Sequence, residues 1–320
     1  MSDKIHDLVI VGGGPAGLSA GIYAMRAALD TVLVEKGVPG GQIALTKDVE
    51  NYPGIEEIGG FELCERFLNH AKRYDLDIRE AEVVSVEPGM DHHEVVLGNG
   101  TRLHTHAVIL AAGGSARKLG ATGELEQYGK GVSYCATCDG FFFRGKTVVV
   151  VGGGDTALED ALYLSKICSK VYLVHRRDEF RGSRILQQRV FAEPRITLVL
   201  SSVVTEIQAD DAGVTGVKVK QVQTGELSHI SADGVFIFVG FVPNNGLVPA
   251  GVKMNAAGYV ITDEKCETNL LGVFAVGDLR QKFANQIVLA AADGCVAALA
   301  AAHYVQTRKD EHQKKVCCPS

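Results

Sequence analysis

Two segments of this chain repeat one pattern of residues. Residues 7–36 read DLVIVGGGPAGLSAGIYAMRAALDTVLVEK, and residues 147–176 read TVVVVGGGDTALEDALYLSKICSKVYLVHR, 140 positions later. Each segment begins with a short β-branched apolar run, turns at glycines into an amphipathic stretch and ends in a second apolar run. This order is typical of a strand, helix and strand in a parallel sheet that is covered on both faces. The repeat therefore predicts two nucleotide-binding units of one design.

The first segment carries a glycine fingerprint for a dinucleotide. Gly12, Gly14 and Gly17 follow the apolar run in the order G-x-G-x-x-G. The first glycine permits a tight turn, the second lets a pyrophosphate approach the backbone, and the third lets helix and strand pack closely. Glu35 stands 18 positions after Gly17, where a carboxylate accepts hydrogen bonds from an adenosine ribose. We expect FAD or a similar dinucleotide without a 2′-phosphate; a glycine turn that binds nothing is the alternative.

The second segment differs at the position that distinguishes nucleotides. Its fingerprint is the variant Gly152-x-Gly154-x-x-Ala157, and the residue 18 positions after Ala157 is a histidine followed by arginines: His175, Arg176, Arg177 and, a little later, Arg181. Guanidinium groups bind the oxygens of a 2′-phosphate through paired, charge-assisted hydrogen bonds. The segment therefore predicts NADPH, and the alternative is a solvated basic face.

Composition limits the remaining possibilities. A chain of 320 residues with 46% hydrophobic content is long enough for about two domains. Its net charge of −6 argues against a nucleic-acid partner. The N-terminal apolar run is too short for a signal peptide or a membrane span, so we expect a cytoplasmic protein with no membrane association. Eight cysteines at irregular spacing do not resemble the disulfide framework of a secreted domain.

One close pair of cysteines, Cys135 and Cys138, lies in the stretch SYCATCDG. A structural zinc would need a second pair of ligands at a suitable spacing, which the sequence lacks, so we expect no metal here. A disulfide that closes so small a ring would constrain the unfolded chain very little. Electron transfer is the best account, because a C-x-x-C pair interconverts readily with its disulfide and one of its thiols often has a low pKa.

Segments outside the repeat indicate how the two units are joined. Residues 106–114 (HAVILAAGG) and 271–279 (LGVFAVGDL) each read as a strand that runs into small residues, and residues 286–303 are Ala-rich and helical. Residues 240–249 carry the Pro and Gly of a crossing between domains. The predicted fold is α/β, with two Rossmann-like three-layer domains, one inserted into the other. The predicted limits are 1–118 and 246–320 for the FAD-binding domain and 119–245 for the NADPH-binding domain.

Taken together, these motifs resemble those of the bacterial, low-molecular-weight thioredoxin reductases along nearly the whole chain. The residues that carry the resemblance are GGGPAG at Gly12, GGQ at Gly40 to Gln42, ENYPG at Glu50 to Gly54, CATCDG at Cys135 to Gly140, GGGDTA at Gly152, HRRDEFR at His175 and AVGD at Ala275. The resemblance implies FAD in the split domain, NADPH and a redox disulfide in the inserted domain, and a homodimer.

The resemblance and the fingerprints together yield a set of predicted site residues. Those expected at FAD are Gly12, Gly14, Ala16, Gly17, Glu35, Lys36, Gly41, Gln42, Asn51, Val83, Gly113, Asp278, Gln286 and Ile287. Those expected at NADPH are Gly152, Gly154, Asp155, Thr156, Ala157, His175, Arg176, Arg177 and Arg181. The predicted catalytic residues are Cys135, Cys138 and Asp139, the last as proton donor and acceptor for the thiolate; a turn or cap role for Asp139 is the alternative.

The activity that the resemblance implies is a relay of electrons. It runs from NADPH through FAD to the disulfide of Cys135 and Cys138, and then to oxidised thioredoxin or a thioredoxin-like dithiol protein. The nicotinamide and the cysteines belong to one domain, yet both have to reach the same flavin. We therefore expect one domain to rotate against the other, with hinges near residues 117–120 and 244–247.

The chain departs from the family's pattern in two places. Ala284-Asn285-Gln286 stands where the family usually has Tyr-Arg-Gln, so an arginine near the flavin is missing, and Arg280 or Lys282 are the candidates to replace it. The C-terminus carries adjacent cysteines, Cys317 and Cys318, which are either a thiol shuttle or an idle, unstructured end. We expect the other cysteines to be ordinary buried thiols: Cys64, Cys168, Cys266 and Cys295.

Three other functions are compatible with some of these motifs. The flavoprotein component of alkyl hydroperoxide reductase shares them but normally adds an N-terminal dithiol domain, whereas this sequence begins at the first FAD strand. A redox sensor would use the cysteine pair without turnover. A reductase fed by ferredoxin or flavodoxin would have little use for Arg176, Arg177 and Arg181.

Overall fold

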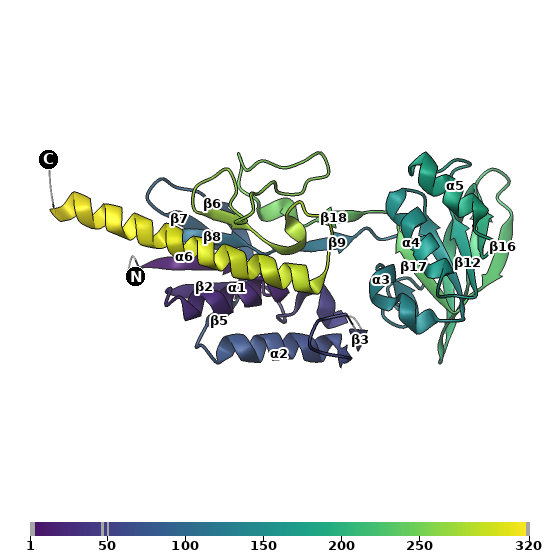
Figure 1. Ribbon diagram of the computed structural model, residues 1–320, viewed down its shortest axis with the longest axis horizontal. Coiled ribbons are helices and arrows are strands. Elements are labelled where there is room, and N and C mark those ends of the chain that lie inside the picture. The colour runs from purple at the N-terminus through teal and green to yellow at the C-terminus, as the bar shows by residue number, and fades with distance from the viewer. Residues whose placement is uncertain (1–3, 46–47, 50, 318–320) are drawn as a thin grey trace.

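A computed structural model describes residues 4–45, 48–49 and 51–317 and places two α/β units one after the other along the long axis of the molecule (Figure 1). The elements of the first unit are β1 (Ile5–Val11), α1 (Pro15–Arg26), β2 (Thr31–Glu35), η1 (Gly41–Leu45), β3 (Asp48–Val49), β4 (Ile58–Gly59), α2 (Gly60–Lys72), β5 (Asp77–Glu80), β6 (Val83–Glu87), β7 (His93–Leu97), β8 (Arg102–Leu110), η3 (Asn245–Leu247), β19 (Val273–Ala275), η4 (Gly277–Leu279) and α6 (Ile287–Cys317).

The elements of the second unit are β10 (Val132–Ser133), α3 (Ala136–Asp139), η2 (Gly140–Phe143), β11 (Thr147–Gly152), α4 (Asp155–Ser165), β12 (Lys170–Val174), α5 (Arg184–Ala192), β13 (Ile196–Val199), β14 (Ser202–Asp210), β15 (Gly213–Gln221), β16 (Leu227–Ser231) and β17 (Gly234–Phe238). The short strands β9 (Gly114–Ala116) and β18 (Phe241–Pro243) lie between the two units.

The predicted repeat is present as two motifs with the same order and pairing of elements. β1 pairs in parallel with β2 around α1, and β11 pairs in parallel with β12 around α4. The glycine turn after β1 is forced by close approach: Gly12 has φ +110°, and a Cβ on Gly17 would overlap the Gly12 carbonyl oxygen. The third glycine of the first fingerprint is thus needed for packing of helix on strand, as the sequence predicts.

The sheet of the first unit has the order β5-β2-β1-β8-β7-β6, with β19 paired to β8. One face of it packs on α1 and α6, and fully buried Leu8, Ile10 and Ile109 fill that core. The other face buries Val9, Val108 and neighbouring side chains against the segment that carries Val252 and Val260. Both faces are covered, which explains why the central strands are continuously apolar.

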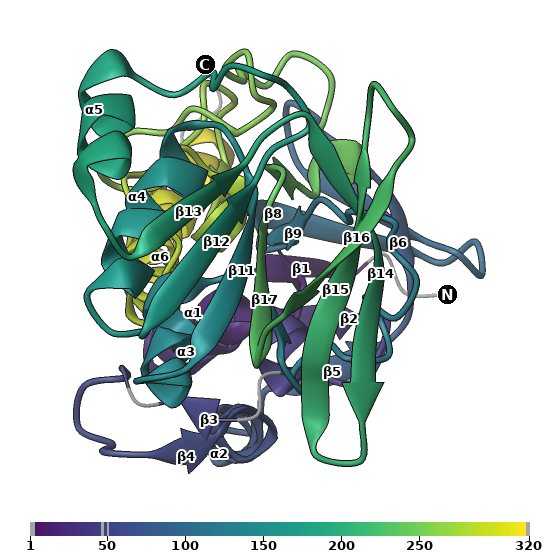
Figure 2. The ribbon, with the colours of Figure 1, turned by 90° about the vertical axis from the view of Figure 1, so that its right-hand side faces the viewer.

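The second unit is a three-layer arrangement. Its parallel sheet has the order β10-β17-β11-β12-β13. Helices α3, α4 and α5 lie on one face, and the antiparallel sheet β14-β15-β16 lies on the other (Figure 2). Val149 and Val151 of β11 pack against Val217 and Val219 of β15. The two-domain α/β architecture predicted from the repeat is therefore confirmed.

The chain crosses between the units twice, and the two crossings are neighbours. β9 and β18 pair antiparallel, with Phe241 opposite Ala116 and Pro243 opposite Gly114. Hydrogen bonds from Arg117 N to Gly240 O (2.9 Å) and from Asn244 N to Gly113 O (3.0 Å) extend this ribbon at both ends. The crossing expected between residues 240 and 249 is therefore formed by β18, while the exact domain limits stay a prediction.

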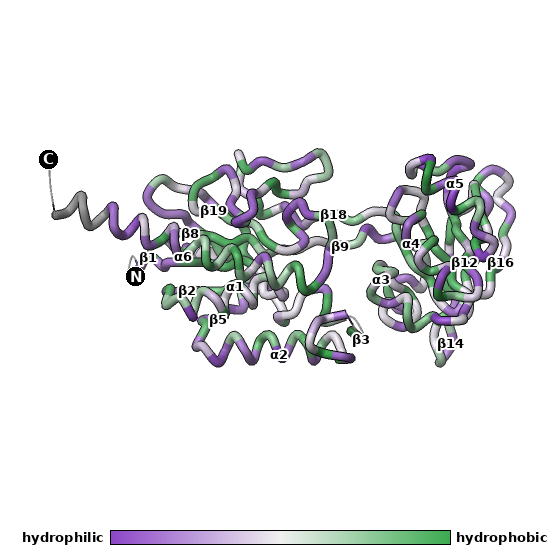
Figure 3. Tube along the Cα trace, viewed as in Figure 1, coloured by the Kyte–Doolittle hydropathy of each residue, from purple (hydrophilic) through white to green (hydrophobic). Residues whose placement is uncertain are grey.

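Helix α6 is the longest helix of the described chain. Apolar residues predominate along the part of α6 that packs on α1, and hydrophilic residues follow toward its C-terminal end (Figure 3). Ser19 Oγ on α1 donates a hydrogen bond to Ala291 O of α6 (2.7 Å), and Ala297, Ala298 and Ala301 are fully buried. By length and composition alone, residues 287–311 would be able to cross a membrane, although 28% of their most apolar window is buried in the protein.

Candidate functional site

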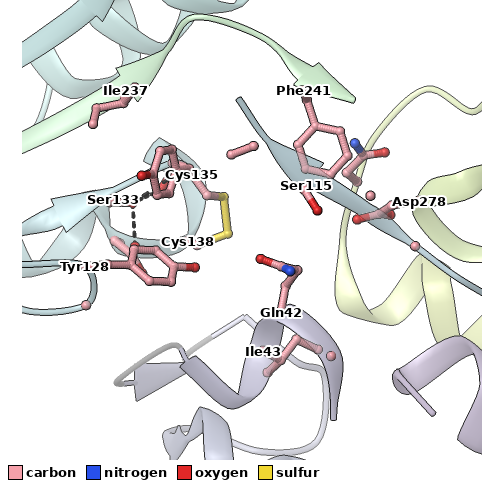
Figure 4. A pocket seen from close by; sticks show the side chains of 18 of the residues that line it. Gln42, Ile43, Ser115, Tyr128, Ser133, Cys135, Cys138, Ile237, Phe241 and Asp278 are labelled. Carbon is pink, nitrogen blue, oxygen red and sulfur yellow. Dashed lines mark hydrogen bonds between the residues drawn. A yellow bond between two sulfur atoms is a disulfide. The ribbon is translucent and has the colours of Figure 1, made fainter. Parts of the chain in front are cut away.

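A large cavity lies between the two units and brings together most of the predicted site residues. Its volume is about 2960 Å³, and both units contribute to its wall. A site for one drug-sized ligand has roughly 300–1,000 Å³, so this cavity has room for more than one extended nucleotide. Figure 4 shows the cysteine pair on the wall of this cavity, with Gln42 facing it from the first unit and Asp278 and Ser115 beyond.

Cys135 and Cys138 form a disulfide at the start of α3. Their Cα atoms are 5.3 Å apart, and both residues line the cavity. Cys135 is the N-cap of this short helix and has extended backbone, whereas Cys138 lies inside it. The helix thereby presents the sulfur atoms toward the opening between the units (Figure 4). The structure thus contains the oxidised form of the predicted redox pair.

Asp139 is tied to the cysteine loop through Ser133. Ser133 Oγ, at the end of β10, donates a hydrogen bond to Asp139 Oδ2 (2.5 Å) and accepts one from Cys135 N (3.1 Å). Ser133 is only 2% exposed, so these bonds have few water molecules to compete with them. The structure places Asp139 on the cavity wall beside the disulfide. Sequence reasoning missed Ser133, because a serine two residues before a cysteine carries no signal of its own.

The first fingerprint fits a dinucleotide. Glu35 Oε2 accepts a hydrogen bond from Gly13 N (2.6 Å) and Oε1 accepts one from Gly37 N (3.1 Å), which holds the carboxylate at the carboxyl end of β2. A Cβ on Gly14 would meet no atom within 4 Å, so the backbone there is open to a phosphate. Of the residues predicted at FAD, the described lining of the cavity includes Gly12, Gly14, Ala16, Glu35, Lys36, Gly41, Gln42, Asn51, Val83, Gly113, Asp278, Gln286 and Ile287. Gly17 packs beneath Gly12 instead.

Gln286 connects the two units across the cavity. It accepts a hydrogen bond from Asn51 Nδ2 through Oε1 (3.3 Å) and donates one from Nε2 to Thr137 Oγ1 (3.3 Å). Thr137 lies between the two redox cysteines. Two residues predicted to contact the flavin are therefore in contact with each other and with the helix that carries the disulfide.

The departure from the family's Tyr-Arg-Gln pattern has a clear structural setting. Asn285 lines the cavity, as does Tyr259. Of the two candidates for the missing arginine, Lys282 lines the cavity, with Nζ 3.1 Å from Asp278 Oδ1. Arg280 binds Asp293 (2.8 Å) and Thr262 (2.7 Å), and Lys282 Nζ is also 3.5 Å from Asp293 Oδ2. Burial raises the pKa of Asp278, and Lys282 opposes that shift, so Lys282 supplies a positive charge at this part of the wall.

The second fingerprint lies on the other unit. A Cβ on Gly153 would overlap the ring of His175, which is 7% exposed at the end of β12. Burial lowers the pKa of His175, and the neighbouring arginines lower it further. Arg181 N donates a hydrogen bond to Gly153 O (2.8 Å), and Ser183 N donates one to Asp155 Oδ1 (2.7 Å). These bonds hold the arginine segment against the glycine turn.

The predicted NADPH residues divide into two groups. The described lining of the cavity includes Gly154, Thr156, Ala157 and Arg181. The others surround the same turn outside that lining: Gly152, Asp155, His175, Arg176 and Arg177. Arg176 and Arg177 are exposed just after the end of β12. The structure therefore places His175 where the first unit has a carboxylate, with guanidinium groups directly after it.

The remaining cysteines are mostly buried, as the sequence predicts. Cys64, Cys168 and Cys266 are buried, and burial raises the pKa of each thiol to about 11, so they are poor nucleophiles at neutral pH. Cys295 is half-buried, which departs from the prediction. Cys317 is the last residue of α6, and Cys318 lies outside the described residues. The shuttle suggested for these two cysteines stays a prediction.

Fold and site together define a two-domain flavoprotein disulfide oxidoreductase that uses a pyridine nucleotide. The family described as "Pyridine nucleotide-disulphide oxidoreductase" matches residues 6–294. The chain belongs to this family and, within it, to the low-molecular-weight thioredoxin reductases. It is 44% identical over 305 residues to the thioredoxin reductase of Bacillus subtilis (strain 168). This match covers 95% of this chain and 96% of that protein.

Solved structures support the same assignment. The crystal structure of thioredoxin reductase from Streptococcus pyogenes MGAS5005 has 40% sequence identity and a TM-score of 0.91, over 96% of this chain and 100% of that one. The thioredoxin reductase of Lactococcus lactis in its FR conformation has 41% identity but a TM-score of only 0.65, over 94% and 99%. Two relatives of nearly equal identity thus superpose on this chain to very different extents.

Proposed function

We infer that this protein is an NADPH-dependent thioredoxin-disulfide reductase. The observation that carries the inference is the disulfide of Cys135 and Cys138 on the wall of a cavity that also contains the FAD-type fingerprint. The arginine-rich fingerprint on the same unit as the cysteines supplies the coenzyme site. Family membership over nearly the whole chain agrees with this arrangement.

The cofactor sites consist of this chain's own residues. Gly12, Gly14 and the start of α1 would hold the FAD pyrophosphate, Glu35 the adenosine ribose and Asp278 the ribityl chain. Arg176, Arg177 and Arg181 would hold the 2′-phosphate of NADPH. A bound flavin supplies the two-electron chemistry that connects a nicotinamide with a disulfide.

The cysteine pair would perform thiol–disulfide exchange with thioredoxin. In the dithiol form, one thiolate sulfur bonds to a sulfur of the partner's disulfide, and the other partner sulfur leaves as a thiolate and takes a proton. The second cysteine of the pair then attacks the sulfur of the first, and the remaining thioredoxin sulfur leaves as a thiolate and takes a proton, so that Cys135 and Cys138 are again a disulfide and thioredoxin is a dithiol. We assign the proton transfer to Asp139, held beside the pair by Ser133.

We further propose that the two units rotate against each other during turnover. In the present arrangement the disulfide faces Gln42 and the FAD-type site (Figure 4), so the nicotinamide would need another arrangement to reach the same flavin. The unequal TM-scores of the two solved relatives, at nearly equal identity, support such a change. The proposed domain limits are 1–118 with 246–320 and 119–245, and the hinges are residues 117–120 and 244–247, next to β9 and β18.

We also propose a cytoplasmic homodimer. Exposed apolar side chains occur on α1, α2 and α6, which lie on one side of the first unit (Figure 1): Tyr23, Phe61, Leu289, Val296 and Leu299. A second copy of the chain would cover them in a two-fold interface. This arrangement also accounts for the apolar surface of α6 without a membrane. Sedimentation at micromolar concentration tests it, and a monomer would contradict it.

The experiment that tests the function follows thiols and flavin together. Purified holoenzyme is mixed with NADPH in a stopped-flow instrument, and oxidised thioredoxin is then added. We expect bleaching of the flavin absorbance, then reduction of thioredoxin over many turnovers. Cys135→Ser and Cys138→Ser should abolish thioredoxin reduction but keep the bleaching, whereas Cys168→Ser, a buried control, should keep both.

Other outcomes identify the rival functions. Bleaching without turnover of thioredoxin by the unaltered protein would indicate a sensor, and an absence of bleaching by NADPH would indicate a different electron donor. A covalent link between the two units should block turnover with thioredoxin while one half-reaction persists; turnover that is unaffected would refute the rotation.

A further inference from the structure

Three side chains that the redox function does not use gather at the hairpin of β7 and β8. His92, Glu94 and His104 each offer one ligand atom, and these atoms lie within 4.8 Å of one another. The described lining of the cavity between the units does not include them. The group therefore belongs to a different part of the first unit.

The register of the hairpin explains why these residues meet. Glu94 of β7 is directly opposite His104 of β8 in the antiparallel pair. His92 precedes Glu94 by two positions, and side chains two apart in an extended chain share one face. The burial pattern of β7 alternates, with His93 and Val95 buried and Glu94 half-buried. All three ligand side chains thus lie on the solvent side of the sheet.

The geometry of the group suits a metal ion. His104 Nδ1 lies 3.9 Å from Glu94 Oε1, and the rings of His92 and His104 meet edge to face with centroids 4.9 Å apart. Ligand atoms about 2.1 Å from a tetrahedral zinc lie about 3.4 Å from each other. Because these side chains lie on the solvent side of the sheet and are partly exposed, small rotations about their side-chain bonds can reach that spacing.

Two further observations favour a ligand here. His104 Nδ1 is buried and has no hydrogen-bond partner among the described residues. Arg102 engages Glu94 through Oε2, whereas Oε1 is the oxygen that faces His104. Arg102 Nη1 also binds Glu87 (3.1 Å). A metal on Oε1 would therefore leave the arginine with both of its carboxylate partners.

We propose that His92, Glu94 and His104 form a binding site for a divalent transition-metal ion, with zinc as the best-suited ion. Two imidazoles and one carboxylate are ligands that zinc accepts, and they leave a fourth position for water. Calcium and magnesium are excluded, because they require many oxygen ligands. The ion would fasten the loop before β7 to β8. The same loop is held to α6 by hydrogen bonds from Arg308 to Met90 O (2.7 Å) and Asp91 O (3.3 Å).

The test is titration calorimetry with zinc chloride on the tag-free, FAD-loaded protein. The protein is kept oxidised so that Cys135 and Cys138 remain a disulfide, and it carries Cys317→Ser and Cys318→Ser so that the terminal thiols bind no zinc. We expect one zinc per chain. Changing a residue outside the ligand shell of a metal already weakens binding roughly 10- to 100-fold. His104→Gln and His92→Gln, which remove a ligand, should therefore weaken it at least about 100-fold.

Control variants distinguish a specific zinc site from zinc binding by any exposed histidine. His229→Gln changes an exposed histidine on β16 of the other unit and should leave zinc affinity unchanged. Zinc should raise the melting temperature of the parent and of His229→Gln, but not of His104→Gln or His92→Gln. Thioredoxin reduction without zinc should be the same in His92→Gln as in the parent, which shows that this variant is folded. Zinc affinity that survives both ligand substitutions, or a parent that binds no zinc, would overturn the proposal.

Discussion

Substitution of Gly14 by alanine separates the two roles that a glycine fingerprint combines. Gly14 has φ −74° and ψ −177°, a conformation that alanine adopts freely, and an added Cβ would meet no atom within 4 Å. Gly17 differs, because a Cβ there would overlap the backbone of Gly12. In the protein without FAD, we therefore expect Gly14→Ala to be neutral or to stabilise by about 0.4–1 kcal/mol, through the less flexible unfolded chain.

The cost of Gly14→Ala should appear only when FAD binds. The added methyl group occupies the space next to the amide groups at the start of α1, where a pyrophosphate has to approach. Overpacking of this kind costs about 1–3 kcal/mol, which corresponds to roughly 5- to 150-fold weaker binding. Gly17→Ala should instead lower the free energy of unfolding of the apoprotein by about 3 kcal/mol or more, because backbone atoms cannot move aside.

Two measurements check this reasoning. Urea unfolding of the apoprotein reports stability, and titration with FAD, followed by quenching of its fluorescence, reports affinity. Gly154→Ala is the matched control in the second unit, since a Cβ there also meets no atom within 4 Å; it should weaken NADPH and leave FAD binding unchanged. Wild-type FAD affinity in Gly14→Ala would refute the assignment of this turn, as would apoprotein destabilisation equal to that of Gly17→Ala.

Three further predictions concern the second unit. The double change of Arg176 and Arg177 to alanine should raise the KM for NADPH roughly 30- to 900-fold, because each partly solvated, charge-assisted contact contributes about 1–2 kcal/mol. It should leave kcat and the KM for NADH unchanged. Equal losses for both coenzymes would contradict this prediction. Ser133→Ala should lower kcat for thioredoxin about 10-fold, because Asp139 loses a hydrogen bond of about 1.5 kcal/mol. Ser165→Ala, a change of another buried serine, should leave kcat unchanged. Equal kcat values in these two variants would exclude the role of Ser133. Burial raises the pKa of Asp160 to about 6, so ionisation of this carboxyl destabilises the fold as pH rises from about 4 through 6. Asp160→Asn should therefore add about 2 kcal/mol to the free energy of unfolding at pH 7 and little at pH 4. A gain in stability that is independent of pH would contradict this explanation.

Much of the fold is predictable because the constraints that produce it are local. The β-branched runs before Gly12 and Gly152 and the helices after them follow from short-range sequence patterns, and the structure has β1, α1, β11 and α4 at those places. Pairing of the antiparallel sheet β14-β15-β16 is not predictable in this way. Its strands half-expose their side chains, and what defines them is burial against β11 and β17 of another layer.

The site residues also divide into those that a local sequence pattern predicts and those that depend on tertiary contacts. Residues within a fingerprint, such as Gly14 and Glu35, are identified by their spacing from one another. Ser133 acquires its role from a contact between β10 and α3, and Gln286 from bonds that reach both units. Lys282 contacts Asp278 on the cavity wall, whereas Arg280 is outside the described lining and binds Asp293 and Thr262. Contacts of this kind depend on tertiary packing, and no short-range pattern encodes them.

The paired strands β9 and β18 have a consequence for how this architecture arose and how it can be altered. Since Ala116 lies opposite Phe241, the inserted segment starts and finishes at nearly one point in space, as a segment must if it is to be added to a loop without disturbing its host. A short peptide joining residue 116 to residue 241 would therefore close the host without the insert. The released segment, with its own parallel sheet and two hydrophobic layers, is a natural module for grafting a dithiol and a coenzyme site onto another scaffold.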